Sequence, residues 1–364
     1  MFDFIPIEDY TLHYYNIVLV FVIIMLVHTT TLNGRELKTM RFNYFFGIIL
    51  FLTVLIYMGL RPISGIFTDM KMYEHMFNAY ENGEVVFTAS SIGFRIFTYI
   101  ATRIMTVEMF FLSCALLYVL PVYVAFKKWY PKYYFFAFLM YAVSFSFWAY
   151  GTNTIRAGMA TSFIILGVAY KDKKWMMSLL FLVAFSFHTS MIVPIGAFIV
   201  TFFYNNTRKY LFWWFFTIIL SLAFSGIWLL LFSKVGFAED KLNFYFLADQ
   251  TAGKFRYIGF RWDFLLYSSI GIYTGYYFII KREYKDKLYI QLYNTYLIAN
   301  SFWILVIRAN FSDRFAFLSW FLMSILISYP LLKKVFWKNQ FSKIGLIVCL
   351  YFLFTYIMNV YILR

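Results

Sequence analysis

Long apolar runs recur along the whole chain, each bounded by a short polar stretch. A helix of about 20 apolar residues crosses the roughly 30 Å hydrocarbon layer of a membrane and satisfies its own backbone hydrogen bonds there. About twelve such segments are predicted, near residues 15–31, 43–60, 107–126, 133–151, 154–170, 175–188, 190–204, 211–232, 263–280, 288–307, 314–332 and 344–362. The pattern predicts an all-α fold, a polytopic helical membrane protein with a single integral membrane domain over residues 1–364.

Composition supports this prediction, because a chain that is 63% hydrophobic and 13% charged has more apolar surface than a soluble domain buries. Two predicted loops are long, about 61–106 and 233–262, both on the outer side in the orientation given below, and the others are short. Residues 175–204 give roughly 45 Å of helix at 1.5 Å per residue, which is long for one span and short for two. We predict two short membrane spans that meet at FSFHTS (185–190).

The basic residues indicate how the helices are oriented, because cytoplasmic loops of membrane proteins are rich in Lys and Arg. With the loop at 32–42 on the cytoplasmic side, alternation places 19 of the 32 basic and 4 of the 17 acidic residues on that side. The formal net charge of +15 then lies entirely on the cytoplasmic face. Topology therefore explains the basic composition, and nucleic acid is not a predicted partner.

Lysine and arginine are distributed unevenly between the two faces. The cytoplasmic side carries 15 Lys and 4 Arg, whereas the outer side carries 4 Lys and 9 Arg. Either residue orients a helix, so topology alone does not require arginine outside. A guanidinium binds phosphate or carboxylate through paired hydrogen bonds and stays charged when partly buried. The outer excess of arginine therefore indicates an anion-binding role.

Four outer arginines, Arg61, Arg156, Arg308 and Arg314, lie at the edges of predicted spans. An ionisable group at membrane depth is costly, so by default it marks a functional site. Arg61 and Asp69 both lie in the segment GLRPISGIFTDMKMY, which Pro and Gly interrupt, and they are candidates to face one cavity. Snorkelling at the interface or pairing with outer carboxylates is the alternative. We favour a cationic pocket, open to the outer side, for an anionic lipid head group such as a diphosphate.

Arg156 and His188 lie at the outer ends of two consecutive predicted helices, in TIRAGMA (154–160) and FSFHTS (185–190). A tight helical hairpin would bring these ends close together. Histidine titrates near neutral pH and can donate or accept a proton. The alternative is a histidine that is hydrogen-bonded within the helix bundle.

A third pair of motifs lies where the chain re-enters the membrane after the outer segments. FRYIGFRWDF contains Arg261 and Asp263, and RANFSDRF contains Asp313 and Arg314. These residues are candidates for the same anion site, and structural salt bridges between them are the competing interpretation.

Several motifs of nucleotide and metal enzymes do not occur in the sequence, including the P-loop, GxGxxG, HExxH and DxD patterns. We therefore predict no metal site and no cofactor. The two cysteines lie inside apolar runs and have no metal-ligand spacing.

The order of the motifs resembles the EpsG-type branch of the Wzy-like polysaccharide polymerases of the bacterial envelope. The residues that carry this resemblance are Arg61, Asp69 and Tyr73; Arg156, Ala157 and Ala160; His188 and Ser190; Arg261 and Asp263; and Arg314 and Phe315. The resemblance extends from about residue 40 to 330. Members often have Gln after the helix-opening Arg, where this chain has Ala157, which has no side-chain amide.

The resemblance implies a GT-C-like architecture and a metal-independent glycosyltransferase of the bacterial inner membrane. Such enzymes join undecaprenyl-diphosphate-linked oligosaccharides on the periplasmic side, moving the growing glycan onto the non-reducing end of a fresh repeat unit. Membrane lipids are implied partners, and such pathways commonly include a chain-length regulator protein. The sequence marks no docking surface for that regulator.

The chemistry of this reaction suggests roles for the candidate arginines, because charge develops on the departing diphosphate. Arg156, Arg261 and Arg314 are expected to bind the diphosphate, with Arg61 and Arg308 as further candidates.

The acceptor hydroxyl needs a base within hydrogen-bond reach. His188 is expected to assist, and Asp69 or Asp263 to contact the acceptor. Asp313 is a further candidate, and the sequence does not rank the four.

Other classes of membrane protein remain as alternatives. An O-antigen-ligase-like oligosaccharide transferase would use the same donor with a different lipid acceptor. A lipid-linked oligosaccharide flippase or other transporter would need polar residues at mid-membrane depth, whereas the charges here gather at the outer edge. An acyltransferase would need a deep histidine on a cytoplasm-accessible path, and His188 is predicted on the other side.

Overall fold

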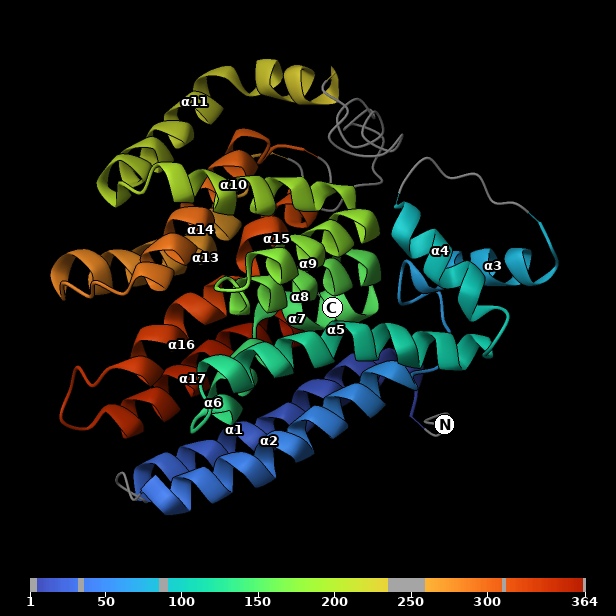
Figure 1. Cartoon of the computed structure of the whole chain (residues 1–364), viewed down its shortest axis with the longest axis horizontal. Helices are drawn as coiled ribbons and strands as arrows, with labels where there is room; N and C mark the ends of the chain where they lie inside the picture. Colours follow the sequence, from blue (N-terminus) through green and yellow to red (C-terminus); the bar gives the residue numbers. More distant parts are fainter. Residues whose placement is uncertain (1–4, 32–35, 85–90, 235–258, 310–311, 363–364) are drawn as a thin grey trace. The chain divides into compact units, whose positions relative to one another are not determined.

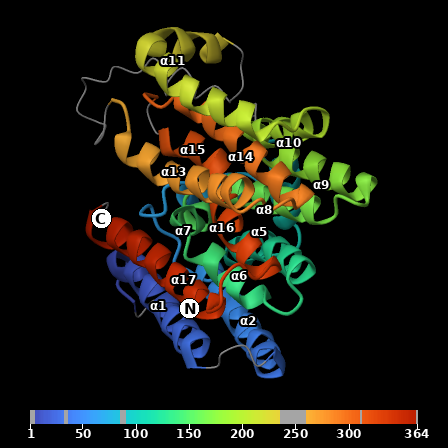
Figure 2. The same ribbon diagram turned by 90° about the vertical axis from the view of Figure 1, so that its left-hand side faces the viewer.

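The computed structural model describes residues 5–31, 36–84, 91–234, 259–309 and 312–362. Every regular element in these ranges is a helix, which confirms the all-α prediction (Figure 1, Figure 2). The helices are η1 (Ile7–Asp9), α1 (Tyr10–Thr31), α2 (Glu36–Gly59), α3 (Met70–Glu81), α4 (Ile92–Ala101), α5 (Val107–Trp129), α6 (Tyr134–Ala142), α7 (Phe145–Thr152), α8 (Ile155–Ala169), α9 (Lys174–Phe187), η2 (Thr189–Met191), α10 (Ile192–Phe203), α11 (Thr207–Lys234), α13 (Trp262–Tyr276), η3 (Tyr277–Lys281), α14 (Lys287–Leu305), α15 (Ser312–Trp320), α16 (Met323–Lys333), α17 (Gln340–Ile357) and η4 (Met358–Ile362).

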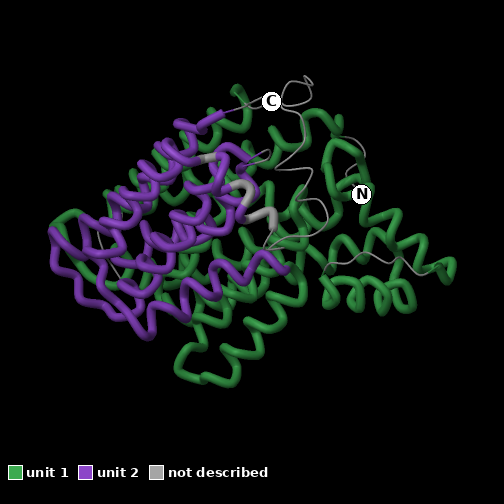
Figure 3. Tube along the Cα trace, turned by 90° about the horizontal axis from the view of Figure 1, so that it is seen from above, with its two compact units in different colours: residues 1–188, 331–364 green, residues 189–330 purple. Residues whose placement is uncertain are grey.

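The chain forms two compact units (Figure 3). Unit 1 comprises residues 1–188 and 331–364, and unit 2 comprises residues 189–330. The single integral membrane domain therefore stays a prediction.

Each of the predicted apolar segments lies on one helix or on consecutive helices. Among the described residues, five helices are long and apolar enough to cross a membrane, or six if the bent pair α6 and α7 forms one span. The five are Ile7–Thr31, Leu37–Gly59, Val107–Trp129, Ser312–Lys333 and Gln340–Ile362. These helices indicate a multi-pass membrane protein, whereas the twelve spans and the GT-C-like architecture remain predictions. Within 175–204, one helix ends at Phe187 and the next begins at Ile192, so the break lies where it was predicted. That each of the two helices is a membrane span stays a prediction.

In unit 1, α5 packs against α2 and α8, α8 packs against α9, and α1 packs against α17. Tyr10 and Tyr57 fasten α1 to α2, since each hydroxyl donates to the other residue's carbonyl, at 2.8 and 2.9 Å. Trp148 of α7 stacks on Tyr14, with 4.1 Å between ring centroids, and donates to Thr11 Oγ1 at 3.1 Å. Hydrogen bonds between helices stabilise packing in hydrocarbon, where water does not compete. The bent α6–α7 segment is thereby fixed to α1.

The long segment 61–106, predicted as a loop, contains the helices α3 and α4. The buried face of α3 consists of residues at helical spacing, namely Met70, Tyr73, Phe77 and Tyr80. This periodicity was present in the sequence and would have identified the helix.

Helix α4 buries Phe94 and packs against α9. The approach is close at Gly93, where an added Cβ would overlap Ser186 of α9. The absence of a side chain at Gly93 therefore allows the two helices to approach closely, and α4 holds the segment 61–106 against the end of α9.

In unit 2, α14 packs against α10, α11, α13 and α15. A buried polar network joins four of these helices around Asn300 of α14. Trp214 of α11 donates to Asn300 Oδ1 at 2.8 Å, and Asn300 Nδ2 donates to Ser268 of α13 at 3.2 Å and to Ser319 of α15 at 3.0 Å. Trp320 Nε1 also donates to Ser268 Oγ, at 2.6 Å. A buried amide is costly unless it is bonded, so the network specifies how these helices fit together.

Candidate functional site

Arg156 is the second residue of α8, in the first turn of the helix. A cation is disfavoured there, because the N-terminus is the positive end of the helix dipole. The same N-terminus attracts anions through its unsatisfied backbone N–H groups. The first turn of α8 and the guanidinium of Arg156 therefore combine into one region of positive potential.

The side chain of Arg156 is held by two residues of the segment 61–106. Its Nε donates to the hydroxyl of Tyr73 on α3 at 2.9 Å, and its Nη1 donates to Ser91 Oγ at 3.1 Å. The guanidinium also lies 5.7 Å from the ring centre of Tyr73 and 5.9 Å from that of Phe94. These contacts come from both α3 and the start of α4, so they fix the orientation of the guanidinium.

Tyr73 also connects Arg156 to a carboxylate. The Tyr73 hydroxyl donates to Asp69 Oδ2 at 3.3 Å while it accepts from Arg156. Asp69 is partly exposed and lies one helical turn before Tyr73. We call Asp69, Tyr73, Ser91 and Arg156 the Arg156 cluster. It joins two motifs that lie far apart in the sequence, at 59–73 and 154–160.

Ser91 was not identified from the sequence. It is buried and adopts a left-handed backbone conformation, with φ 62° and ψ 59°, directly before α4. This conformation costs about 1 kcal/mol or more in a residue other than glycine. The cost is consistent with a functional position, since it is the Oγ of this residue that binds Arg156.

His188 caps the C-terminus of α9, with its backbone N–H donating to Ala184 O at 3.0 Å. Because α8 packs against α9, Arg156 and His188 lie at the same end of this helical pair, as predicted. Phe94 links the two regions, since its ring lies near Arg156 and 6.4 Å from that of Phe187. The chemical role of His188 remains a prediction.

Arg61 is in a different environment, because only 4% of its surface is exposed. Its guanidinium donates to Met58 O in the last turn of α2 and, at 3.4 Å, to Thr152 O at the end of α7. Burial lowers the pKa of Arg61 to about 10, so the side chain remains a cation at neutral pH. A cation at two helix C-termini stabilises both. These contacts favour a structural role for Arg61 over the predicted diphosphate contact.

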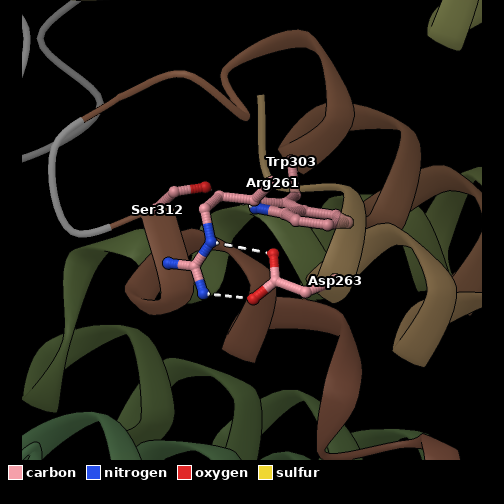
Figure 4. Close-up of polar contacts among 4 residues, drawn as sticks. All are labelled: Arg261, Asp263, Trp303 and Ser312. Atoms are coloured by element: carbon pink, nitrogen blue, oxygen red, sulfur yellow. Dashed lines mark hydrogen bonds and ion pairs between the residues drawn. The ribbon is translucent and has the colours of Figure 1, made fainter. Parts of the chain in front are cut away.

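In unit 2, Arg261 and Asp263 form a bidentate ion pair at the start of α13 (Figure 4). Nε and Nη2 of Arg261 donate to the two carboxylate oxygens at 2.9 and 2.6 Å. The guanidinium also lies 3.4 Å from the ring centre of Phe264. The competing interpretation from the sequence, a structural salt bridge, therefore describes this pair well.

The junction of α14 and α15 lies beside this ion pair. Trp303 of α14 donates to Ser312 Oγ of α15 at 2.9 Å, which fastens the end of one helix to the start of the next (Figure 4). The neighbouring carboxylate of Asp313 experiences the positive charges of both Arg314 and Arg261. The predicted residues of the third motif pair are thus brought together within unit 2.

Arg308 lies in the turn that follows α14. Its Nε is buried, and no residue in the described part of the chain accepts a hydrogen bond from it. Arg156 belongs to unit 1, whereas Arg261, Arg308 and Arg314 belong to unit 2. The convergence of these arginines on one diphosphate therefore stays a prediction.

In the described ranges, no three acidic, histidine or cysteine side chains lie together in a way that could hold a metal ion.

Comparison with known proteins gives one match. The chain matches the family model described as the EpsG family over residues 44–364. Comparisons with curated proteins and with solved structures find no match. The family match covers most of the chain and includes every candidate site residue. The chain therefore belongs to the EpsG family, which indicates a membrane protein that polymerises polysaccharide.

Proposed function

We propose that the chain is a Wzy-like polymerase of the bacterial inner membrane that joins undecaprenyl-diphosphate-linked oligosaccharides on the periplasmic side. The observation that carries the proposal is Arg156, a cation at the start of a helix whose guanidinium is oriented by Tyr73 and Ser91. Such an arrangement suits a phosphate ligand, because the guanidinium and the helix N-terminus attract the same negative charge.

In the proposed reaction, a hydroxyl at the non-reducing end of the acceptor attacks the anomeric carbon of the donor glycan. A new C–O bond forms, the bond from that carbon to the diphosphate oxygen breaks, and the hydroxyl proton passes to a base. Negative charge accumulates on the departing lipid diphosphate. A guanidinium that is already oriented stabilises this charge without reorganising during the reaction.

Among the candidate bases, the contacts favour Asp69. Its carboxylate is partly exposed and receives a bond from Tyr73. Both carboxylate oxygens of Asp263 are bonded to Arg261, so that carboxylate is less available to accept a proton. We assign the base to Asp69, with Tyr73 as a positioning residue, and His188 to assisting the transfer.

Two arginines of unit 2 differ in their hydrogen bonds to other residues of the chain. Arg261 is bound to Asp263, whereas the Nε of Arg308 has no described partner. Of the predicted diphosphate ligands in this unit, Arg308 is therefore favoured over Arg261. A chain-length regulator remains a proposed partner, and no cofactor is proposed.

The test is polymerisation in vitro by the purified protein, supplied with undecaprenyl-diphosphate-linked repeat units in the presence of EDTA and without nucleotide. A ladder of lengthened lipid-linked glycan is expected, and Arg156→Ala should abolish it. The exposed Arg208→Ala on α11 is the matched control and should polymerise normally. Movement of the lipid-linked unit across vesicle membranes without a ladder would favour the flippase alternative instead.

A further inference from the structure

A pocket of about 500 Å³ lies between α3 and α4 in unit 1, outside the Arg156 cluster. Pockets of this size accommodate small molecules or part of a lipid. The residues that line it are Tyr80, Gly83, Glu84, Ile92, Arg95, Ile96, Tyr99 and Arg103. None of these residues has been given a role in polymerisation above.

The outer face of α4 next to this pocket is a stripe of isoleucines four residues apart. The stripe consists of Ile92, Ile96 and Ile100 of α4, which are 64%, 53% and 52% exposed, and it continues with Ile104 in the turn after the helix, which is 70% exposed. Residues at this spacing lie on one side of a helix. Four exposed aliphatic side chains in a row are unfavourable in water, whereas an amphipathic helix at a membrane surface buries such a face among acyl chains.

Two cations border the stripe. Arg95 donates from Nε to the hydroxyl of Tyr80 on α3 at 3.4 Å, and the guanidinium of Arg103 lies 5.2 Å from the ring centre of Tyr99. Glu84 is the one carboxylate in the lining, so the lining has a formal net charge of +1. Cationic side chains beside an interfacial apolar face select anionic lipid head groups.

We propose that the α3–α4 pocket binds an anionic phospholipid, with Arg95 and Arg103 on its phosphate and an acyl chain along the isoleucine stripe. The aliphatic stripe favours a lipid over a glycan, because sugar rings pack on aromatic faces and need many polar partners. Tyr73 of α3 and Ser91, the residue directly before α4, hold Arg156. A bound lipid would therefore stabilise the segment that orients Arg156, although lipid binding itself does not depend on polymerase activity.

The test uses the full-length protein with the photoreactive residue benzoylphenylalanine in place of Ile100. The protein is placed in vesicles of equal parts phosphatidylglycerol and phosphatidylcholine, with soluble maltoheptaose added, and cross-linked adducts are identified by mass spectrometry. We expect phosphatidylglycerol adducts to exceed phosphatidylcholine adducts about tenfold, because two charge-assisted contacts favour the anionic lipid. The same probe at Ile104 gives a second reading if the first variant folds poorly.

The paired substitutions Arg95→Gln and Arg103→Gln should reduce this preference to about the 1:1 composition of the vesicle, with lipid adducts still formed. The control pair Lys173→Gln and Lys174→Gln removes two exposed charges at the other end of α9 and should leave the preference intact. The proposal would be overturned if the probe labelled both lipids equally in the protein that keeps Arg95 and Arg103. Adducts with maltoheptaose in place of lipid would also overturn it.

Discussion

Replacing Tyr73 with phenylalanine removes one hydroxyl and leaves the aromatic ring in place. The ring should keep its edge contact with Phe94, 5.0 Å between centroids, and its position under the guanidinium of Arg156. What is lost is the acceptor for Arg156 Nε and the donor to Asp69. The variant therefore separates the orientation of the arginine from its charge, which is unchanged.

The size of the effect follows from these bonds. A hydrogen bond to a charged group contributes about 1.5–3 kcal/mol, and Ser91 still holds Nη1 in the variant. We expect a loss of about 1.5 kcal/mol in transition-state stabilisation, which lowers the polymerisation rate roughly tenfold. Loss of the bond to Asp69 should act in the same direction if this carboxylate is the base.

The assay is the initial rate of ladder formation by purified protein at saturating lipid-linked substrate. Tyr356→Phe is the matched control, because its hydroxyl also bonds to one side chain, Asn16 Oδ1 at 2.9 Å, between α17 and α1. This control should polymerise at the wild-type rate. A wild-type rate for Tyr73→Phe would refute the idea that its hydroxyl orients Arg156 for catalysis.

Three further predictions test the cluster and the packing around it. Arg156→Lys keeps the charge but cannot bond to both partners, so the initial rate of polymerisation should fall about 100-fold; a rate above half of wild type would contradict this. Asn300→Ala should lower the free energy of unfolding in detergent by about 2–3 kcal/mol, since it strands buried donors and acceptors. Thr274→Ala is the control and should leave the free energy of unfolding nearly unchanged, because it loses only a hydrogen bond within its own helix. Equal losses of stability in Asn300→Ala and Thr274→Ala would contradict the stabilising role of the network. Gly93→Ala should lower the melting temperature by forcing α4 from α9, and adding Ser186→Gly should recover part of the loss; no recovery would mean that the overlap is not the cause.

The sequence predicted the helices well where apolar residues form long runs. Other features left weaker signals or none. The bend of 73° between α6 and α7 falls at Val143 and Ser144, without a proline or glycine to mark it. Helix α3 was missed because its polarity is mixed, and α4 was missed because its apolar run is too short to cross a membrane. The buried residues of both helices nevertheless have helical spacing.

The sequence identified most residues of the candidate site but not the contacts between them. Arg156, Asp69 and Tyr73 were singled out, but the bond from Arg156 to Tyr73 joins positions 83 residues apart, and no local pattern encodes it. The role of Arg61 depends on where the ends of α2 and α7 meet, which follows from tertiary packing. Ser91 binds Arg156 from an uncommon left-handed backbone conformation, and a serine in the sequence does not indicate this conformation.

The central claim is that Arg156 binds the diphosphate of the lipid carrier, and equilibrium binding tests it most directly. The purified protein in nanodiscs is titrated with undecaprenyl diphosphate and, as a matched ligand without phosphate, with undecaprenol. Wild-type protein should prefer the diphosphate, and Arg156→Ala should reduce this preference at least about tenfold, the effect of losing one or two charge-assisted hydrogen bonds. The same preference in the wild-type protein and in Arg156→Ala would contradict the account.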